Sequence, residues 1–220
     1  LDPQLVLRRG YALLTDALDL VTTIQSPDAL AQFEDPARYT IAEGNSTVKE
    51  IMAYNDRVAP FDNVKVRKAL ARGIDKQKLL EAVWGDRGMV LGSFVPPTDP
   101  WYEDLTGVDA YDPESAKALL AEAGLPDGFT FTLETPNYDP HPITAEFIKA
   151  ELAKIGVTVN INIITANEWY TKVYQAKDFQ ATLQEHVNHR AVAFDGTPDF
   201  YRAHDNADGT RLTAEAAAAA

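Results

Sequence analysis

The chain has 220 residues, 45% of them hydrophobic, and carries a formal net charge of −13. This length allows a substantial apolar core, whereas the acidic excess argues against nucleic acid and anionic membranes, since both attract clustered Lys and Arg. The lack of cysteine excludes disulfides and thiolate metal sites, and the lack of a run of about 18 apolar residues predicts no membrane span.

The N-terminal quarter alternates between helical and strand-like patterns. Apolar residues at helical spacing predict a helix over residues 8–18, and the composition of residues 20–24 then favours a strand. The Ser-Pro-Asp sequence at residues 26–28 is typical of a helix start, because serine accepts first-turn N–H groups and proline suits the first helical position. Residues 47–54 predict a strand that ends at Asn55.

Two helices are predicted next, each opened by a capping side chain. Asp62 or Asn63 can cap a helix that runs to about Arg72. Asp75 can cap a second helix, which carries Leu79 among its apolar residues.

A long loop and a third helix follow. Residues 85–106 are rich in Gly and Pro and predict an ordered loop with a short strand at residues 89–91. The Asp-Pro-Glu sequence at 112–114 opens the next helix by the same capping logic. Gly124 and then Pro126 end it, because glycine suits a left-handed cap and proline cannot continue a helix.

The remaining part alternates strands with single helices, which predicts an α/β domain with a largely parallel or mixed sheet. In order, the predicted elements are a strand over 129–135, a helix over 143–155, a strand over 157–163, a helix capped by Asn167 and a strand over 179–183. We expect one domain over residues 1–205, followed by a tail over 206–220 with a low-complexity alanine run.

The histidines offer weak support for a metal site. His186 and His189 are three residues apart, a spacing that places two imidazoles on one face of a helix. The preceding segment is strand-like, however, and residues i and i+3 of a strand face opposite sides. No His-Glu-x-x-His motif is present. We therefore expect no metal and no cofactor, and a metal-dependent hydrolase that uses these histidines and nearby acids is kept as an alternative.

Catalytic motifs are also missing from the rest of the sequence. The acids Asp195, Asp199, Asp205 and Asp208 fit no calcium loop, and acids beside Gly and Pro are common in turns. The chain contains no Gly-x-Ser-x-Gly elbow and no glycine-rich phosphate-binding or dinucleotide-binding loop. The sequence thus predicts a binding protein rather than an enzyme.

An ordered set of segments carries a family resemblance. Its centre is the run from Pro60 to Lys76, which is similar to the signature Pro-Phe-x-Asp-x-x-Val-Arg-x-Ala-Leu-x-x-x-Ile-Asp-Arg/Lys. The other segments, in order, are residues 16–24, 28–30, 39–41, 51–55, 96–97, 111–124, 128–129, 151–156 and 157–163. Over residues 11–183 the set closely resembles the C-terminal lobe of extracellular solute-binding proteins of the oligopeptide, dipeptide and nickel class (family 5), which feed ABC importers.

The resemblance implies a fold and a function. The fold is one lobe of a periplasmic-binding-protein type II fold, a mixed sheet flanked by helices, with the N-terminal lobe of the same protein absent. The implied function is the substrate-binding component of an ABC importer, which captures a peptide or similar small solute between two lobes by hinge closure. A sensor protein coupled to a chemoreceptor shares the fold and is the alternative.

Partners and location follow from the same resemblance. They are a small-molecule or peptide ligand and ABC permease subunits at the membrane, with no nucleic acid, and the protein is expected to be a monomer. The implied location is the periplasm or, as a lipoprotein, the cell surface. Because the first residues lack a basic segment followed by an apolar stretch, the export signal is expected upstream of residue 1.

The resemblance also implies candidate ligand contacts. In peptide-binding relatives, a segment after the last strand carries an aromatic residue and then an Asp-x-x-Pro motif, whose aspartate accepts the α-ammonium of the ligand. Asp195 opens the nearest match, although no Trp precedes it, and His186 lies about where the aromatic residue would fall. Further candidates to line the cleft are Tyr54, Asn55 and Trp84, together with Tyr170 and with Trp169, which suits a core position better.

Overall fold

The computed structural model describes residues 48–85, 87–98 and 102–187, together with Phe33, Asp35, Ala37, Tyr39 and Ile41. These residues fall into two compact units. The larger unit comprises the described residues within 33–41, 52–90 and 109–184, and the smaller comprises those within 48–51, 91–108 and 185–187. The elements expected over residues 8–28, and Asp195 with the tail, lie outside the described residues.

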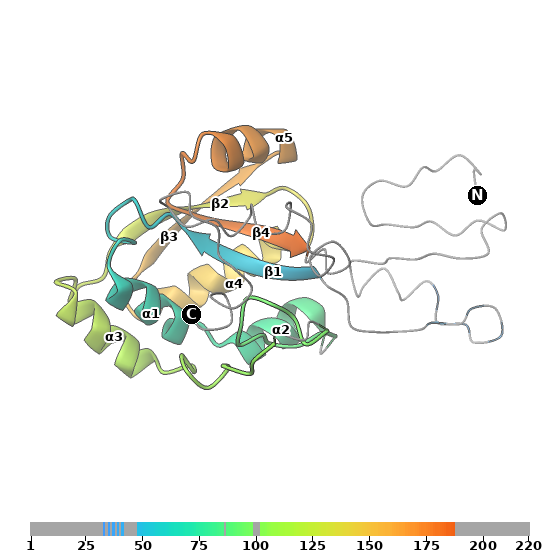
Figure 1. The fold of residues 1–220 in the computed structure, drawn as a ribbon, viewed down its shortest axis with the longest axis horizontal. Helices are drawn as coiled ribbons and strands as arrows, with labels where there is room; N and C mark the ends of the chain where they lie inside the picture. The colour runs from blue at the N-terminus through green and yellow to red at the C-terminus, as the bar shows by residue number, and fades with distance from the viewer. Residues whose placement is uncertain are drawn as a thin grey trace, which may run out of the picture. The chain divides into compact units, whose positions relative to one another are not determined.

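A four-stranded sheet in the order β1-β4-β2-β3 organises the fold (Figure 1). The strands are β1 (Val48–Tyr54), β2 (Thr130–Pro136), β3 (Thr158–Ile164) and β4 (Ala181–Val187). β2 is parallel to both its neighbours, with Leu133 opposite Ile161 of β3 and Ala181 of β4. β1 runs opposite to β4, because Asn55 after β1 donates its backbone N–H to the carbonyl of Gln180 before β4, at 2.9 Å. The predicted mixed sheet is confirmed.

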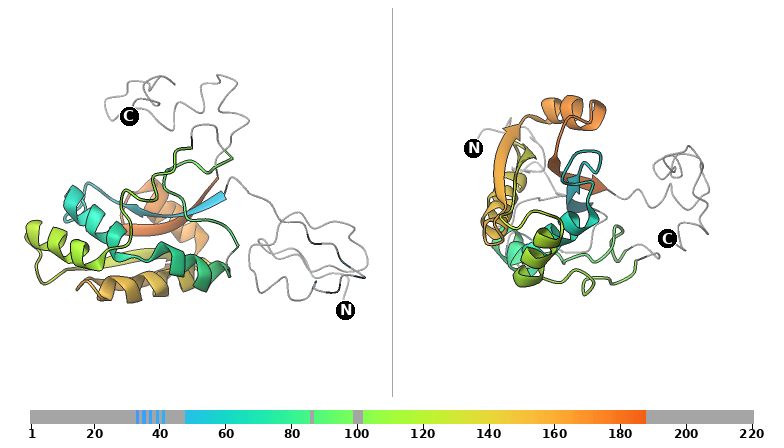
Figure 2. Two further views of the ribbon diagram at one scale, coloured as in Figure 1. Left: turned by 90° about the horizontal axis from the view of Figure 1, so that it is seen from below. Right: turned by 90° about the vertical axis from the view of Figure 1, so that its left-hand side faces the viewer.

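Helices lie on both faces of this sheet. They are α1 (Val64–Gly73), α2 (Lys76–Trp84), α3 (Pro113–Glu122), α4 (His141–Ala153) and α5 (Ala166–Trp169), which continues into the π-helix η2 (Tyr170–Gln175). α4 packs on β2 and β3, and α1 packs on α3. Figures 1 and 2 show α5 on the face opposite to α1 and α4. None of the described helices has the length and apolar character needed to cross a bilayer.

Side chains cap the helices as the sequence predicts. Asn63 accepts the backbone N–H of Lys65 at 2.9 Å at the start of α1. Asp75 does the same for Lys78 at 3.1 Å in α2, and Asp112 caps α3 through Ser115 at 2.9 Å. Each contact satisfies a first-turn N–H group that has no partner within the helix.

Three local predictions are wrong. Residues 89–91 form no strand, because no neighbouring strand pairs with them among the described residues. The cap of α5 is Thr165 rather than the predicted Asn167, because Thr165 and Glu168 form a reciprocal capping box. β4 runs on to Val187, past the predicted end at residue 183.

The core lies between the sheet and α1, α3 and α4. Phe131 and Leu133 of β2 are buried there, and the Phe61 ring lies 5.3 Å from that of Phe131. Because side chains alternate along a strand, Thr132 and Glu134 face the other side of the sheet, toward α5 and η2. The fold thus has one apolar face and one polar face within its larger unit. In the smaller unit, Nζ of buried Lys49 lies 4.0 Å from the centre of the Phe94 ring.

Candidate functional site

A pocket of about 310 Å³ lies on the polar side of the larger unit. Its walls come from β2, β3, η2, the turn after β1 and the segment that leads into β4. The lining residues are Val58, Thr132, Glu134, Asn162, Lys172, Lys177, Asp178, Phe179 and Gln180.

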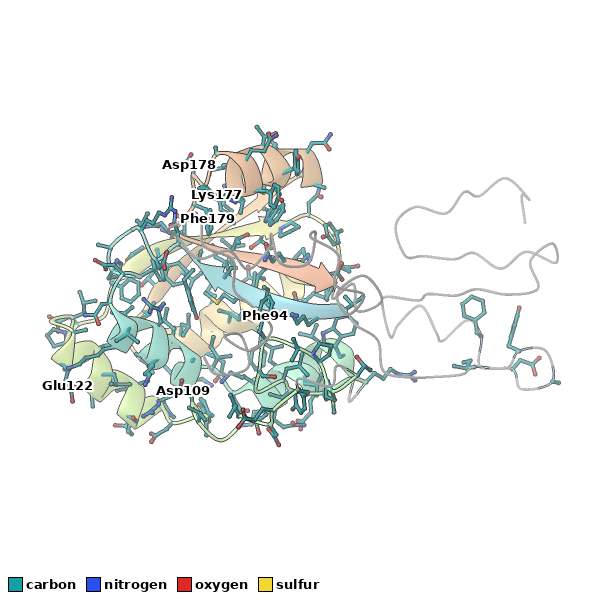
Figure 3. The ribbon with its side chains drawn as sticks, in the orientation of Figure 1. Phe94, Asp109, Glu122, Lys177, Asp178 and Phe179 are labelled. Carbon is teal, nitrogen blue, oxygen red and sulfur yellow. The ribbon has the colours of Figure 1, made fainter. Side chains whose placement is uncertain are left out.

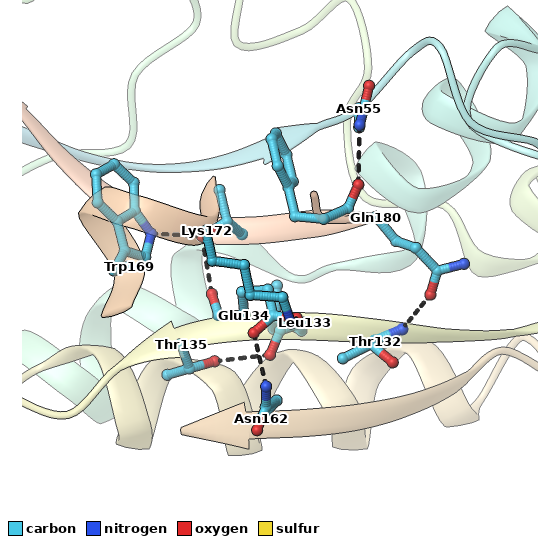
Figure 4. Close-up of polar contacts among 11 residues, drawn as sticks. Asn55, Thr132, Leu133, Glu134, Thr135, Asn162, Trp169, Lys172 and Gln180 are labelled. Carbon is cyan, nitrogen blue, oxygen red and sulfur yellow. Dashed lines mark hydrogen bonds and ion pairs between the residues drawn. The ribbon is translucent and has the colours of Figure 1, made fainter. Parts of the chain in front are cut away.

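Glu134 is the buried charge at the base of this pocket, with 3% of its surface exposed. Lys172 of η2 donates to its Oε1 at 2.6 Å, and the Asn162 amide of β3 donates to its Oε2 at 2.7 Å (Figure 4). The hydrogen bond to Glu134 raises the pKa of Lys172 above its ordinary value. Lys172 is therefore an ammonium at neutral pH, and the carboxylate stays paired, as a buried charge must.

The same network fastens α5 to the sheet. Trp169 Nε1 donates to the Thr182 hydroxyl of β4 at 2.8 Å. That hydroxyl lies 2.9 Å from the Glu134 carbonyl, to which it donates in turn. Trp169 therefore docks α5 on the sheet.

Polar side chains also fix the segment that leads into β4. Asn55 donates its amide N–H groups to the carbonyls of Phe179 at 2.9 Å and Lys177 at 3.1 Å. Gln180 Oε1 accepts the backbone N–H of Thr132 at 2.7 Å, next to the contact of Asn55 with Gln180 (Figure 4). The entrance to β4 is thus held by β1 on one side and β2 on the other.

Sequence reasoning missed this cluster. Glu134, Asn162 and Lys172 come from three different elements, and Glu134 is 28 positions from Asn162 and 38 positions from Lys172 along the chain. Each looks like an ordinary surface residue in its own segment. The only sequence signal is an acid inside an otherwise apolar and threonine-rich strand, where a charge is unexpected.

The residues predicted from the sequence lie elsewhere. The Tyr54 ring stacks on Phe61 at 5.4 Å, and burial raises the pKa of Tyr54 well above its ordinary value. Asn55 contacts backbone beside the pocket, and Trp84 is half-buried at the end of α2. None of these three lines the pocket.

His186 is a residue of β4, but its side chain and Asp195 lie outside the described residues. The role of all five in ligand binding stays a prediction.

The carboxyl edge of the parallel strands is a second candidate surface. Ligands of open α/β sheets bind outside the carboxyl ends of the strands. β2 and β3 end together here, and Asn137 after β2 donates its N–H to the carbonyl of Ile164 at 3.0 Å. β4, which carries His186, runs in the same direction as β2.

The described residues contain no group of three or more His, Asp or Glu side chains that could hold a metal ion. His189 falls outside the part of the chain that the structure describes.

Comparisons with known proteins give a consistent result. The family described as bacterial extracellular solute-binding proteins, family 5 middle, matches residues 7–209. Heme-binding protein A of Haemophilus influenzae is 37% identical over 159 residues, which cover 70% of this chain and 28% of that protein. The dipeptide-binding protein of Escherichia coli is 34% identical over 174 residues, covering 76% of this chain and 32% of that protein.

A solved structure supports the same relation. The dipeptide-binding protein from Pseudoalteromonas sp. SM9913, in complex with Met-Leu, matches with a TM-score of 0.69 and 28% identity. The match covers 80% of this chain and 34% of that one. The chain therefore spans about a third of the length of the relatives it matches.

Proposed function

Because this chain belongs to the bacterial extracellular solute-binding proteins of family 5, we propose that it is one lobe of a protein that captures a small solute for an ABC importer. The match of the family to residues 7–209 carries this proposal. A peptide is the favoured class of solute, because the matched E. coli protein is named for dipeptides and the Pseudoalteromonas protein holds Met-Leu.

Capture follows from closure of two lobes around the solute. Contacts made by both lobes exist only in the closed state, so ligand shifts the equilibrium toward it. In this proposal the lobe offers the carboxyl edge of β2 and β3 and the segment after β4. The permease subunits of the importer then bind the closed form.

Asp195 is the proposed partner of the ligand's α-ammonium. A carboxylate and an ammonium in a closed, water-poor cleft attract strongly, and removal of one partner costs about 2–5 kcal/mol. His186 is the proposed neighbour on the ligand, and Tyr54, Asn55 and Trp84 are further proposed contacts.

Location and state are part of the same proposal. The whole protein acts as a monomer in the periplasm, or as a lipoprotein at the cell surface. A similar protein from Helicobacter pylori is named an ABC transporter-associated periplasmic binding protein, which supports this location.

The test begins with the longer protein purified gently from its host. Native mass spectrometry should reveal a carried ligand, and calorimetry with dipeptides should show tight binding. Asp195→Asn should weaken binding of a free dipeptide by about 30-fold or more, but leave an N-acetylated dipeptide unaffected relative to the unchanged protein. Equal losses for both ligands would assign Asp195 another role.

Deletion of the gene distinguishes an importer from a sensor. Uptake of the radiolabelled ligand should stop in the deleted strain and return on complementation. Normal uptake with lost chemotaxis toward the ligand would instead establish the sensor.

A further inference from the structure

The pocket around Glu134 has hydrogen-bond donors that its own residues do not use. Both oxygens of Glu134 are engaged, one by Lys172 and one by Asn162. The Lys172 ammonium has three N–H groups, of which one reaches Glu134 among the described residues, and 37% of its side chain is exposed. Gln180 accepts through Oε1, which leaves its NH₂ group to donate. The pocket therefore offers donors from two sides.

The rim adds one more cation and one anion. Lys177 lines the pocket, and its Nζ lies 4.7 Å from the centre of the Tyr174 ring. Asp178 follows it in the turn between η2 and β4 (Figure 3). Asp178 acts on Lys172 as Glu134 does, and the two lysines and two acids of the lining cancel in charge. The pocket therefore disfavours a ligand with two negative charges.

The remaining wall is apolar and the volume is small. Phe179 and Val58 supply the apolar surface. A volume of about 310 Å³ lies at the lower limit for small-molecule pockets. It suits a small molecule rather than a long peptide chain.

We propose that this pocket binds a small monocarboxylate anion, with its carboxylate between Lys172 and Gln180 and its short alkyl chain against Phe179 and Val58. Glu134 and Asn162 act as positioning residues, because they hold the Lys172 ammonium at the base. The site uses none of the residues proposed to bind the imported solute. A failed test of this pocket would therefore leave the proposed transport function unaffected, and the reverse is also true.

The test is a titration of the 220-residue chain with sodium butyrate, followed by the amide signals of Thr132, Lys177 and Gln180 in ¹⁵N NMR spectra. The Thr132 N–H is a direct reporter, because it donates to Gln180. We expect saturable shifts with a Kd on the order of 1–10 mM, as suits so small a ligand. The uncharged 1-butanol and the cationic butylammonium should give no saturable shift at these amides.

Two outcomes of this titration would overturn the proposal. One is the absence of saturation at butyrate concentrations about tenfold above the expected Kd. The other is equal binding of inorganic phosphate, which would make the pocket a general anion site and refute the carboxylate assignment.

Variants locate the site. The double change Glu134→Gln with Lys172→Gln removes the charge pair without leaving a buried ion alone, and should weaken butyrate binding at least tenfold. Lys117→Gln is the control, because Lys117 pairs with Glu114 on the surface of α3 and is expected to have no effect. If the double variant does not fold, Lys177→Gly is the alternative test. Because this change removes the cation at the rim, it should weaken butyrate binding about threefold, and an unchanged affinity would refute the assignment.

Discussion

Lys177 adopts a backbone conformation that L side chains rarely accept. Its φ is +57°, and it is the only non-glycine residue with positive φ in the described part of the chain. The turn is fixed because the N–H of Asp178 donates to the carbonyl of Lys172 at 3.0 Å, as in helix ends that use a left-handed residue. Residue 177 therefore carries a conformational cost that glycine would not.

This cost can be measured with two substitutions that remove the same side chain. Lys177→Gly and Lys177→Ala both lose the contact with Tyr174, but only glycine relieves the left-handed strain. We expect the glycine variant to be more stable than the alanine variant by about 1 kcal/mol, as measured by urea denaturation. Equal stabilities would show that the turn relaxes around alanine.

Asp75, at the start of α2, makes the stability of the fold depend on pH. Burial alone would raise the pKa of Asp75, but the backbone N–H and the ammonium of Lys78 bind the carboxylate and leave its pKa below the ordinary value. The charged form therefore stabilises the fold above the unfolded pKa of about 3.9, and this contribution is lost as the pH falls through the folded pKa.

Asp75→Asn isolates the charge, because asparagine still caps the helix. The free energy of unfolding should be lower in the variant than in the wild type at pH 7, and the two should converge at pH values below the folded pKa. Denaturant titrations across this range provide the measurement. Asp75→Ala, which also loses the cap, should stay less stable at every pH, and a constant gap for Asp75→Asn would contradict the assignment.

At the scale of elements, two glycines allow β2 and β3 to begin side by side. Gly128 has a φ of +77°, and a Cβ there would lie 1.9 Å from the carbonyl oxygen of Gly156. Because of this close approach, the backbone N–H of Thr158 donates to the carbonyl of Phe129 at 2.8 Å, where the pairing of the two strands begins. Backbone, rather than a flexible side chain, blocks any larger residue at position 128.

Gly128→Ala should therefore destabilise the fold by roughly 2–4 kcal/mol, through both the strained φ and the clash. Gly124→Ala is the matched control: its φ is +82°, but nothing lies within 4 Å of the added carbon, so it should cost only about 1 kcal/mol. Thermal unfolding of the two variants gives the comparison. If both cost the same, the backbone contact with Gly156 contributes nothing.

Elements were predictable from the sequence where their signals are local. Asn63, Asp75 and Asp112 cap helices through N–H groups two or three residues away, so a short window contains the whole interaction. The apolar run at 89–91 failed for the opposite reason: a strand needs a partner, and no window shows whether one is present. Polar residues at the end of β4 concealed its true length.

At the scale of the molecule, the fold class was predictable and the pocket was not. The alternation of strands and helices, and the family signature, depend on order along the chain. Glu134, Asn162 and Lys172 meet only because β2 pairs with β3 and η2 returns over the polar face. Nothing in the separate segments specifies that meeting.

The whole protein should bind its solute far better than this chain does. If a second lobe supplies part of the contacts, the 220-residue chain should bind the dipeptide more than tenfold more weakly than the longer protein. Calorimetry on both, with the same dipeptide and buffer, tests this. Equal affinity would mean that the chain encloses the solute alone, against the two-lobe proposal.

β4 sits between β1 and β2, yet it is the last described strand to be synthesised. Until β4 has emerged from the ribosome, the edges of β1 and β2 that pair with β4 have unpaired backbone N–H and C=O groups. Such unpaired edges promote aggregation. A messenger truncated before the codon for Ala181 would yield a product that never receives this neighbour. Such a product would depend on chaperones to escape precipitation, however well its helices form.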